Sequence, residues 1–306
     1  MPIRKLLPII LVVSLLLTAC GSDASDGSGD GLKVVASTTI VGDVVSQVGG
    51  DLIDLTVLFP PGADPHTFES RPQDIAVISD ADVVVIHGLG LEETLESTLD
   101  ANVNGLLVHA AEGVDTIALE GGGHEDEHAH EGEDPHTWTD PNNVIIWAGN
   151  IASALSEADP ANAATYQSNT GTYINELREL DTWIRAQVES IPVEQRELVT
   201  DHASFGYFAE EYGFEQVGLV VASLSTNAAP SAKELAELTD AIKEHGVPAI
   251  FVGTTVNPAL AEQVAGDTGA QIVFVYTGSL SEPGGEADSY ITFMRYNVNA
   301  IVEALK

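Results

Sequence analysis

The residues of this chain that are best suited to chemistry are histidines in a repeated pattern. The tetrapeptide Asp-Pro-His-Thr occurs at 64–67 and again at 134–137, and an aromatic residue follows it both times. Proline restricts the backbone, so the imidazoles of His66 and His136 would be held at a small cost in conformational entropy. Neutral imidazole is a good ligand for zinc and similar metals. One histidine in such a loop is usually an ordinary surface residue, but the recurrence predicts that both bind a metal ion.

A third candidate ligand is His202, which follows a short apolar run at 197–200. We expect that run to be a strand and a helix to follow over Ala203–Tyr212, a junction at which α/β proteins place ligands. Asp201 either caps this helix or accepts a hydrogen bond from the imidazole. The alternative to a metal ligand here is an ordinary histidine at a helix N-terminus.

Residues 121–133 (GGGHEDEHAHEGE) hold three more histidines, His124, His128 and His130. HEDEH matches the zinc-protease pattern H-E-x-x-H, which requires a regular helix with a packed apolar face. Three glycines and a run of acids provide no such face, so we reject that interpretation. We expect the segment to capture cations for a fixed site, and the alternative is a solvated insertion without a role.

The other motifs argue against an enzyme. We assign His87, His109 and His245 to structural positions, because two of them end apolar runs and the third ends a helix. The sequence contains no G-x-x-x-x-G-K-[ST] phosphate loop and no G-x-S-x-G nucleophile elbow. The one cysteine, Cys20, excludes an intramolecular disulfide and a cysteine-based zinc finger.

The N-terminus has the features of an export signal with a lipid attachment site. Two basic residues precede an apolar run at 6–17, which is too short to span a membrane comfortably. Leu-Thr-Ala-Cys-Gly follows and resembles a bacterial lipobox, in which the cysteine is acylated. We predict a signal peptide over 1–19, a lipid on Cys20 as the only membrane link, and a flexible tether over 20–31. The alternative is an ordinary secretory signal.

Composition limits the classes of function. The chain carries 47 acidic and 11 basic residues, a formal net charge of −36. Such a field repels nucleic acids and anionic membrane surfaces and favours cations. A hydrophobic fraction of 44% over 306 residues is enough for folded cores in about two domains. We expect an acidic monomer that does not bind nucleic acid.

Strands and helices alternate along both halves of the chain, which predicts an α/β fold with parallel-rich sheets. The expected strands are the apolar runs at 33–37, 52–59, 82–87, 105–109, 197–200, 216–221, 249–252 and 271–276. The expected helices are the periodic segments at 40–49, 72–79, 92–99, 142–158, 203–212, 231–245, 258–268 and 289–305. Ser231 and Glu234 form a capping box at the start of one of them.

Between the halves lies a long segment without a strand-like run. Its apolar residues recur at helical steps: Tyr166, Tyr173, Leu177, Leu180 and Ile184. This spacing predicts a helix of roughly 25–30 residues with Asp159 as its N-cap. A helix of this length can connect two lobes rigidly. We therefore predict two α/β lobes, 32–158 and 191–306, joined by a linking helix over 159–190.

These motifs, in this order, resemble the zinc- and manganese-binding lipoproteins of bacterial ABC uptake systems, the ZnuA/TroA-like (cluster A-I) solute-binding family. The resemblance covers the chain from about Leu32. It rests on the lipobox, GADPHTFES, the His- and acid-rich stretch before DPHTWTDP, TDHASFGYFAEEYG and GSLSEPGGEADSYITFMRYN. It implies two lobes joined by a long rigid helix, with the metal in the cleft between the lobes.

Carried over by motif, His66, His136 and His202 take the ligand positions. Histidine at the third position is similar to the zinc-preferring members, whereas glutamate there is the commoner manganese pattern. Three imidazoles also suit Zn²⁺ better than the harder Mn²⁺.

The chain departs from the family pattern at Gly278 and Gly253, where many relatives have aspartate and glutamate respectively. A carboxylate ligand is therefore missing. Water, a histidine of the 121–133 segment, Glu69 or Asp140 remain as alternatives for the fourth ligand.

Residues and resemblance together predict a lipid-anchored receptor outside the cytoplasmic membrane that binds Zn²⁺ and passes it to an ABC permease. A manganese receptor of the same type is the first alternative. An envelope zinc hydrolase is a second, because three histidines and a water are the usual ligand count of a catalytic zinc. An adhesion lipoprotein with a vestigial metal site is a third, motivated by the missing carboxylates.

Overall fold

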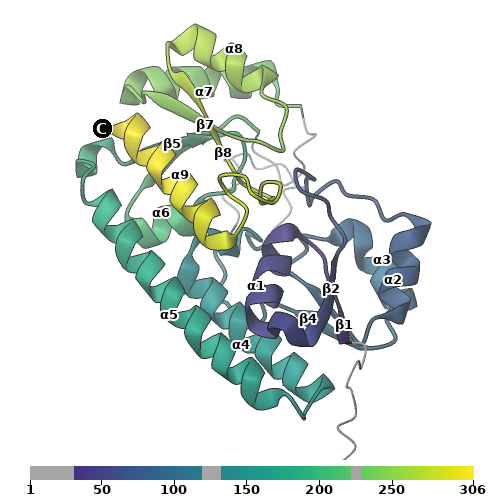
Figure 1. Ribbon diagram of the computed structural model, residues 1–306. Coiled ribbons are helices and arrows are strands. Elements are labelled where there is room, and N and C mark those ends of the chain that lie inside the picture. Colours follow the sequence, from purple (N-terminus) through teal and green to yellow (C-terminus); the bar gives the residue numbers. More distant parts are fainter. Residues whose placement is uncertain (1–30, 119–131, 222–228) are drawn as a thin grey trace, which may run out of the picture. The chain divides into compact units, whose positions relative to one another are not determined.

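The described part of the computed structural model is built on two four-stranded parallel sheets, one in each half of the chain (Figure 1). The structure describes residues 31–118, 132–221 and 229–306. The first sheet has the order β2-β1-β3-β4, from β1 (Leu32–Ala36), β2 (Ile53–Val57), β3 (Val83–Ile86) and β4 (Leu106–His109). The second has the order β6-β5-β7-β8, from β5 (Glu197–Thr200), β6 (Glu215–Leu219), β7 (Ala249–Gly253) and β8 (Gln271–Val275). Both halves therefore use the same strand order.

Helices cover both faces of the first sheet, as a parallel sheet requires. One face packs against α1 (Thr39–Gly49) and α4 (Pro141–Ala158). The other face packs against α2 (Pro72–Asp80) and α3 (Glu93–Asn102). The central strand β3 reads Val-Val-Val-Ile and is buried along its whole length, which is why its hydrophobic residues do not alternate with polar ones.

The second sheet is layered in the same way. The helices α7 (Ala232–His245) and α8 (Ala259–Thr268) pack on one face. On the other face lie α6 (Gly206–Tyr212) and α9 (Tyr290–Leu305). The expected capping box at the start of α7 is confirmed: the Glu234 amide donates to the Ser231 hydroxyl, and the Ser231 amide donates to the Glu234 carboxylate.

The long helix α5 (Ala163–Val188) joins the two halves (Figure 1). It packs against α4 and α1 from the first half and against α9 from the second. The buried face of α5 contains the five residues expected from the spacing: Tyr166, Tyr173, Leu177, Leu180 and Ile184. These residues belong to one hydrophobic core that extends from the first sheet to the second. The predicted α/β fold, with two lobes that each contain a parallel sheet and one long linking helix, is therefore confirmed.

Two local expectations were wrong. Asp159 does not begin the long helix but ends α4, because its amide donates to the Leu155 carbonyl, and α5 begins four residues later at Ala163. The helix expected over Ala203–Tyr212 is shorter and starts at Gly206. The remaining short helical turns are 3-10 segments at Gly50–Leu52, Thr137–Thr139 and Val193–Gln195.

The predicted signal peptide over 1–19, the lipidation site Cys20, most of the predicted tether, and the histidines His124, His128 and His130 lie outside the described residues. Within the described ranges, no helix has both the length and the apolar character needed to cross a membrane.

Candidate metal centre

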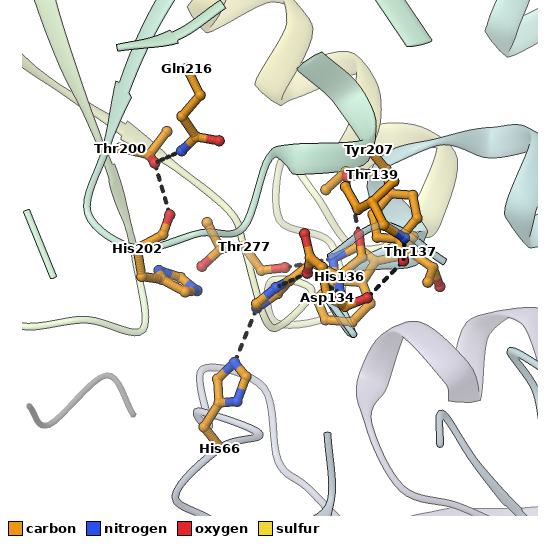
Figure 2. Close-up of polar contacts among 12 residues, drawn as sticks. His66, Asp134, His136, Thr137, Thr139, Thr200, His202, Tyr207, Gln216 and Thr277 are labelled. Carbon is orange, nitrogen blue, oxygen red and sulfur yellow. Dashed lines mark hydrogen bonds and ion pairs between the residues drawn. The ribbon is translucent and has the colours of Figure 1, made fainter. Parts of the chain in front are cut away.

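Loops that follow strands or precede helices carry the three candidate ligands (Figure 2). His66 lies in the loop between β2 and α2, and His202 lies two residues after β5. His136 immediately precedes the 3-10 turn that leads into α4. The carboxyl ends of parallel strands are the usual place for a binding site in such sheets. The site is therefore assembled from both halves of the chain.

The three imidazoles converge on one point. One ligand atom from each of His66, His136 and His202 lies within 4.8 Å of the other two. The Nε2 atoms of His66 and His136 are 3.1 Å apart. The ring centroids are separated by 5.1 Å for His66 and His136, 6.0 Å for His66 and His202, and 5.2 Å for His136 and His202. His136 and His202 are buried, and His66 is half-buried. Such a cluster of nitrogen donors can hold one transition-metal ion.

Two carboxylates orient the imidazoles. Asp134 Oδ1 lies 2.7 Å from His136 Nδ1, and Asp201 Oδ1 lies 2.9 Å from His202 Nδ1. Each carboxylate therefore accepts the Nδ1 proton and leaves Nε2 as the free ligand atom, as in many zinc sites. The two alternatives for Asp201 are resolved: it holds the imidazole, and it does not cap α6, whose N-cap position is taken by Phe205.

The repeated Asp-Pro-His pattern has a local explanation. The amide of His66 donates to Asp64 Oδ1 at 3.0 Å, and the amide of His136 donates to Asp134 Oδ1 at 2.8 Å. An aspartate that accepts a hydrogen bond from the backbone two residues later forms an Asx turn. The turn fixes where each histidine leaves the backbone, so the pattern positions the ligand before any metal binds.

Burial and neighbouring charges move the pKa values of two ligands in opposite directions. Burial, reinforced by the neighbouring His136 and His202, lowers the pKa of His66 to about 2. For His202, burial favours the neutral ring, but Asp201 outweighs it and the pKa of the imidazole is raised above 6.5. At neutral pH His66 is therefore neutral and able to bind a metal, whereas at His202, as a candidate ligand, protons compete with a metal.

The histidines assigned to structural positions lie outside this cluster. His87 is fully buried between Trp138 and Trp147, with ring centroids 5.3 and 4.9 Å away, and neither ring nitrogen has a partner among the described residues. Burial lowers the pKa of His87 to about 3, so the ring stays neutral in the core. His109 and His245 are both exposed.

The carboxylates proposed as fourth ligands do not join the cluster either. Within the described residues, the group of potential ligands contains the three histidines and no carboxylate. Asp140 instead caps α4 by accepting a hydrogen bond from the Asn142 amide at 2.9 Å. Glu69 also lies outside the group.

Trp138 is a residue of the site that sequence analysis did not identify. Its ring lies 5.2 Å from that of His136, its Nε1 donates to the Thr277 carbonyl at 2.9 Å, and its own carbonyl accepts from the Tyr290 hydroxyl at 2.7 Å. Both of these partners belong to the second half of the chain. The aromatic residue in the repeated pattern was the available signal, and its role is to attach the His136 loop to the second half.

Two glycines lie close to these loops, at positions where a side chain would collide with its neighbours. A Cβ atom on Gly278 would lie 2.6 Å from Pro65 Cδ, and one on Gly253 would lie 2.4 Å from Thr277 Oγ1. Both separations are shorter than real carbon contacts, so a larger residue at either position requires its neighbours to move. The carboxylates that the resemblance places at Gly253 and Gly278 do not fit the present packing.

We expect Asp201→Asn to weaken Zn²⁺ binding about 10- to 100-fold, a typical loss when the hydrogen-bond partner of a ligand is changed. The reason is that Asp201 accepts from both His202 Nδ1 and the Gly253 amide, and an asparagine would present an N–H group to one of these donors. Isothermal titration measures the change, with the exposed Asp240→Asn as the matched control. Equal affinities for both variants would contradict the orienting role.

Comparison with known proteins points to proteins of metal uptake. The family model described as "Zinc-uptake complex component A periplasmic" matches residues 34–304. The manganese-binding lipoprotein MntA of Halalkalibacterium halodurans is 36% identical over 300 residues, with 97% of each chain covered. The manganese ABC transporter substrate-binding lipoprotein PsaA of Streptococcus pneumoniae is 33% identical over 306 residues, again with 97% of each covered.

Solved structures show the same architecture. The periplasmic zinc binding protein TroA of Treponema pallidum superposes with a TM-score of 0.82 at 25% identity, covering 90% of this chain and 99% of that one. The Mn-bound periplasmic metal binding protein of Candidatus Liberibacter asiaticus superposes with a TM-score of 0.79 at 29% identity and the same coverage.

Proposed function

We propose that this chain, which belongs to the zinc-uptake component A family of solute-binding proteins, captures a divalent transition metal and delivers it to the permease of an ABC uptake system. The observation that carries the proposal is the convergence of His66, His136 and His202, with ligand atoms within 4.8 Å of one another. The family consists of binding proteins and not of enzymes. Its members are therefore not zinc hydrolases, and the hydrolase alternative is dropped.

The protein is an extracytoplasmic lipoprotein of the cell envelope, and the relatives that it matches over 97% of their length are named as lipoproteins. We propose that residues 1–19 are the export signal, that Cys20 carries the lipid, and that 20–31 tether the folded part. The lobes are proposed to span 32–158 and 191–306, with 159–190 between them. His124, His128 and His130 are proposed to capture metal in an auxiliary role.

Manganese is the transported metal that the relatives favour. The protein that is 36% identical to this chain is named a manganese-binding lipoprotein, and the one that is 33% identical is named the substrate-binding lipoprotein of a manganese ABC transporter. This replaces zinc, which the sequence favoured, as the leading candidate for the cargo in the cell.

Zinc is a second candidate, and the donor set supports it. The described cluster offers three imidazoles and no carboxylate, whereas Mn²⁺ is better suited by oxygen ligands. Affinity for nitrogen and oxygen sites rises from Mn²⁺ towards Zn²⁺ in almost any protein, so selectivity in the cell also depends on metal availability. Tighter zinc binding in vitro is therefore expected whichever metal is transported.

The test is the metal content of the protein isolated from its native envelope without chelators, measured by mass spectrometry of the elements. About one equivalent of manganese is expected for a manganese receptor, and about one equivalent of zinc for the second candidate. The His66→Ala variant isolated in parallel is the control and should lose that equivalent. A wild-type protein that carries neither metal, and takes up neither on titration, would contradict the proposed function.

A further inference from the structure

We propose that the hydroxyl group of Thr277 binds the water molecule that completes the coordination of the metal, and so replaces the carboxylate that this site lacks. The inference rests on the proposed function, because it assigns a role at the same metal site. Thr277 is a positioning residue in this proposal: it contacts the ligand water and not the metal itself.

The first observation is the position of the segment that contains Thr277 and Gly278. It lies beside residues that are close in sequence to His136 and His66. The Thr277 carbonyl accepts from Trp138, two residues after His136, and a Cβ on Gly278 would meet Pro65, the residue before His66. Figure 2 shows Thr277 between His202 and His136.

The second observation places the hydroxyl on the His202 side of the site. A Cβ on Gly253 would lie 2.4 Å from Thr277 Oγ1 and 3.1 Å from Asp201 Oδ2, so both oxygens border the same small space beside Gly253. The other oxygen of Asp201 holds the His202 ring. The Thr277 hydroxyl is therefore close to the group that orients the third ligand.

The third observation is that this hydroxyl has no partner. Thr277 is 1% exposed, and its Oγ1 atom makes no hydrogen bond with any of the described residues. A buried hydroxyl without a partner costs free energy, about 1–3 kcal/mol in general. Such a group is expected to acquire a partner when the ligand binds, and the free energy of that hydrogen bond then contributes to affinity.

The chemistry of the site explains why a hydroxyl suffices. Three histidines leave a tetrahedral ion with one open position, which a water molecule usually fills. A metal-bound water is more acidic than bulk water and is a strong hydrogen-bond donor. The Thr277 oxygen can accept that hydrogen bond without adding charge, whereas the packing of Pro65 against Gly278 leaves no room for a carboxylate side chain at position 278.

The test compares Thr277→Val, which keeps the shape and removes the hydroxyl, with Thr277→Ser, which keeps the hydroxyl. Both are titrated with Co²⁺ and Zn²⁺ beside the wild-type protein, and the exposed Thr254→Val is the matched control for the exchange itself. We expect Thr277→Val to bind about 10-fold more weakly, as is typical for loss of an outer-shell partner. We also expect its visible Co²⁺ bands to change in intensity or position.

Thr277→Ser and Thr254→Val should keep the wild-type affinity and spectrum. Equal affinity and an equal Co²⁺ spectrum for Thr277→Val and wild type would overturn the proposal. Equal weakening by valine and serine would also overturn it, because it would indicate a packing role. If Thr277→Val does not fold, as judged by circular dichroism, Thr277→Ala takes its place.

Failure of this inference can be distinguished from failure of the proposed function. If the wild-type protein binds no metal, or if the histidine variants bind as tightly as wild type, the proposed function itself is wrong. If the wild type binds and the histidine variants do not, a normal Thr277→Val variant would contradict only the role of the hydroxyl.

Discussion

His136→Ala should weaken Zn²⁺ binding about 1,000-fold or more, which corresponds to about 4 kcal/mol. The loss should exceed the 10- to 100-fold effect of changing a residue that only hydrogen-bonds to a ligand, because a metal–nitrogen bond itself is removed. His136 is the central candidate ligand of the group: it is 1% exposed, its Nε2 lies 3.1 Å from His66 Nε2, and its ring is held by Asp134. Competition with a chromophoric chelator measures the affinity.

The matched control is His245→Ala, a histidine outside the cluster that is paired with Glu197. It should bind zinc as the wild type does. Circular dichroism and thermal melting of both variants show whether the fold is kept. A His136→Ala protein that is folded and binds within about 10-fold of wild type would exclude this residue as a ligand, because that loss is no more than an outer-shell change causes.

The second large effect is the dependence of affinity on pH. Because Asp201 raises the pKa of His202 above 6.5, this imidazole becomes protonated as the pH falls below that pKa. The imidazolium cannot bind metal, so affinity is complete above the pKa and is lost below it. Between pH 7.5 and pH 5 we expect a loss of about 30-fold or more, one proton being displaced for each ion bound.

Burial keeps His66 out of this competition, since its pKa is lowered to about 2. The matched variant is therefore His202→Gln, which binds metal more weakly but carries an amide that takes up no proton in this pH range. Its affinity should change less with pH than that of the wild type. An unchanged wild-type affinity from pH 7.5 to pH 5 would contradict histidine ligation, provided that the protein remains folded at both ends.

Most of the fold could be predicted because the elements have strong local signals. Buried parallel strands appear as continuous apolar runs, as in Val83–Ile86, and α7 begins with a capping box. The start of α5 could not be placed, because Asp159 has two possible roles. In the folded chain it ends α4, and its carboxylate accepts hydrogen bonds from the Asn162 side chain and the Tyr166 hydroxyl.

The candidate site was predictable to a different degree for each kind of residue. The three clustered histidines could be proposed as ligands from the sequence because the Asp-Pro-His-Thr pattern repeats and Asp201-His202 follows a strand. The bond from Trp138 to the Thr277 carbonyl could not, because 139 residues separate the partners and a backbone acceptor has no sequence signature. The identity of the transported metal depends on more than the ligand types, which is why the imidazoles pointed to zinc while the relatives point to manganese.

The measurement that tests the account most directly is a Zn²⁺ titration of three proteins: the wild type, the triple variant His66→Ala/His136→Ala/His202→Ala, and a deletion of residues 121–133. We expect one tightly bound equivalent in the wild type and in the deletion protein, and none in the triple variant. Binding that persists in the triple variant and disappears with residues 121–133 would place the site outside the histidine cluster and contradict the account.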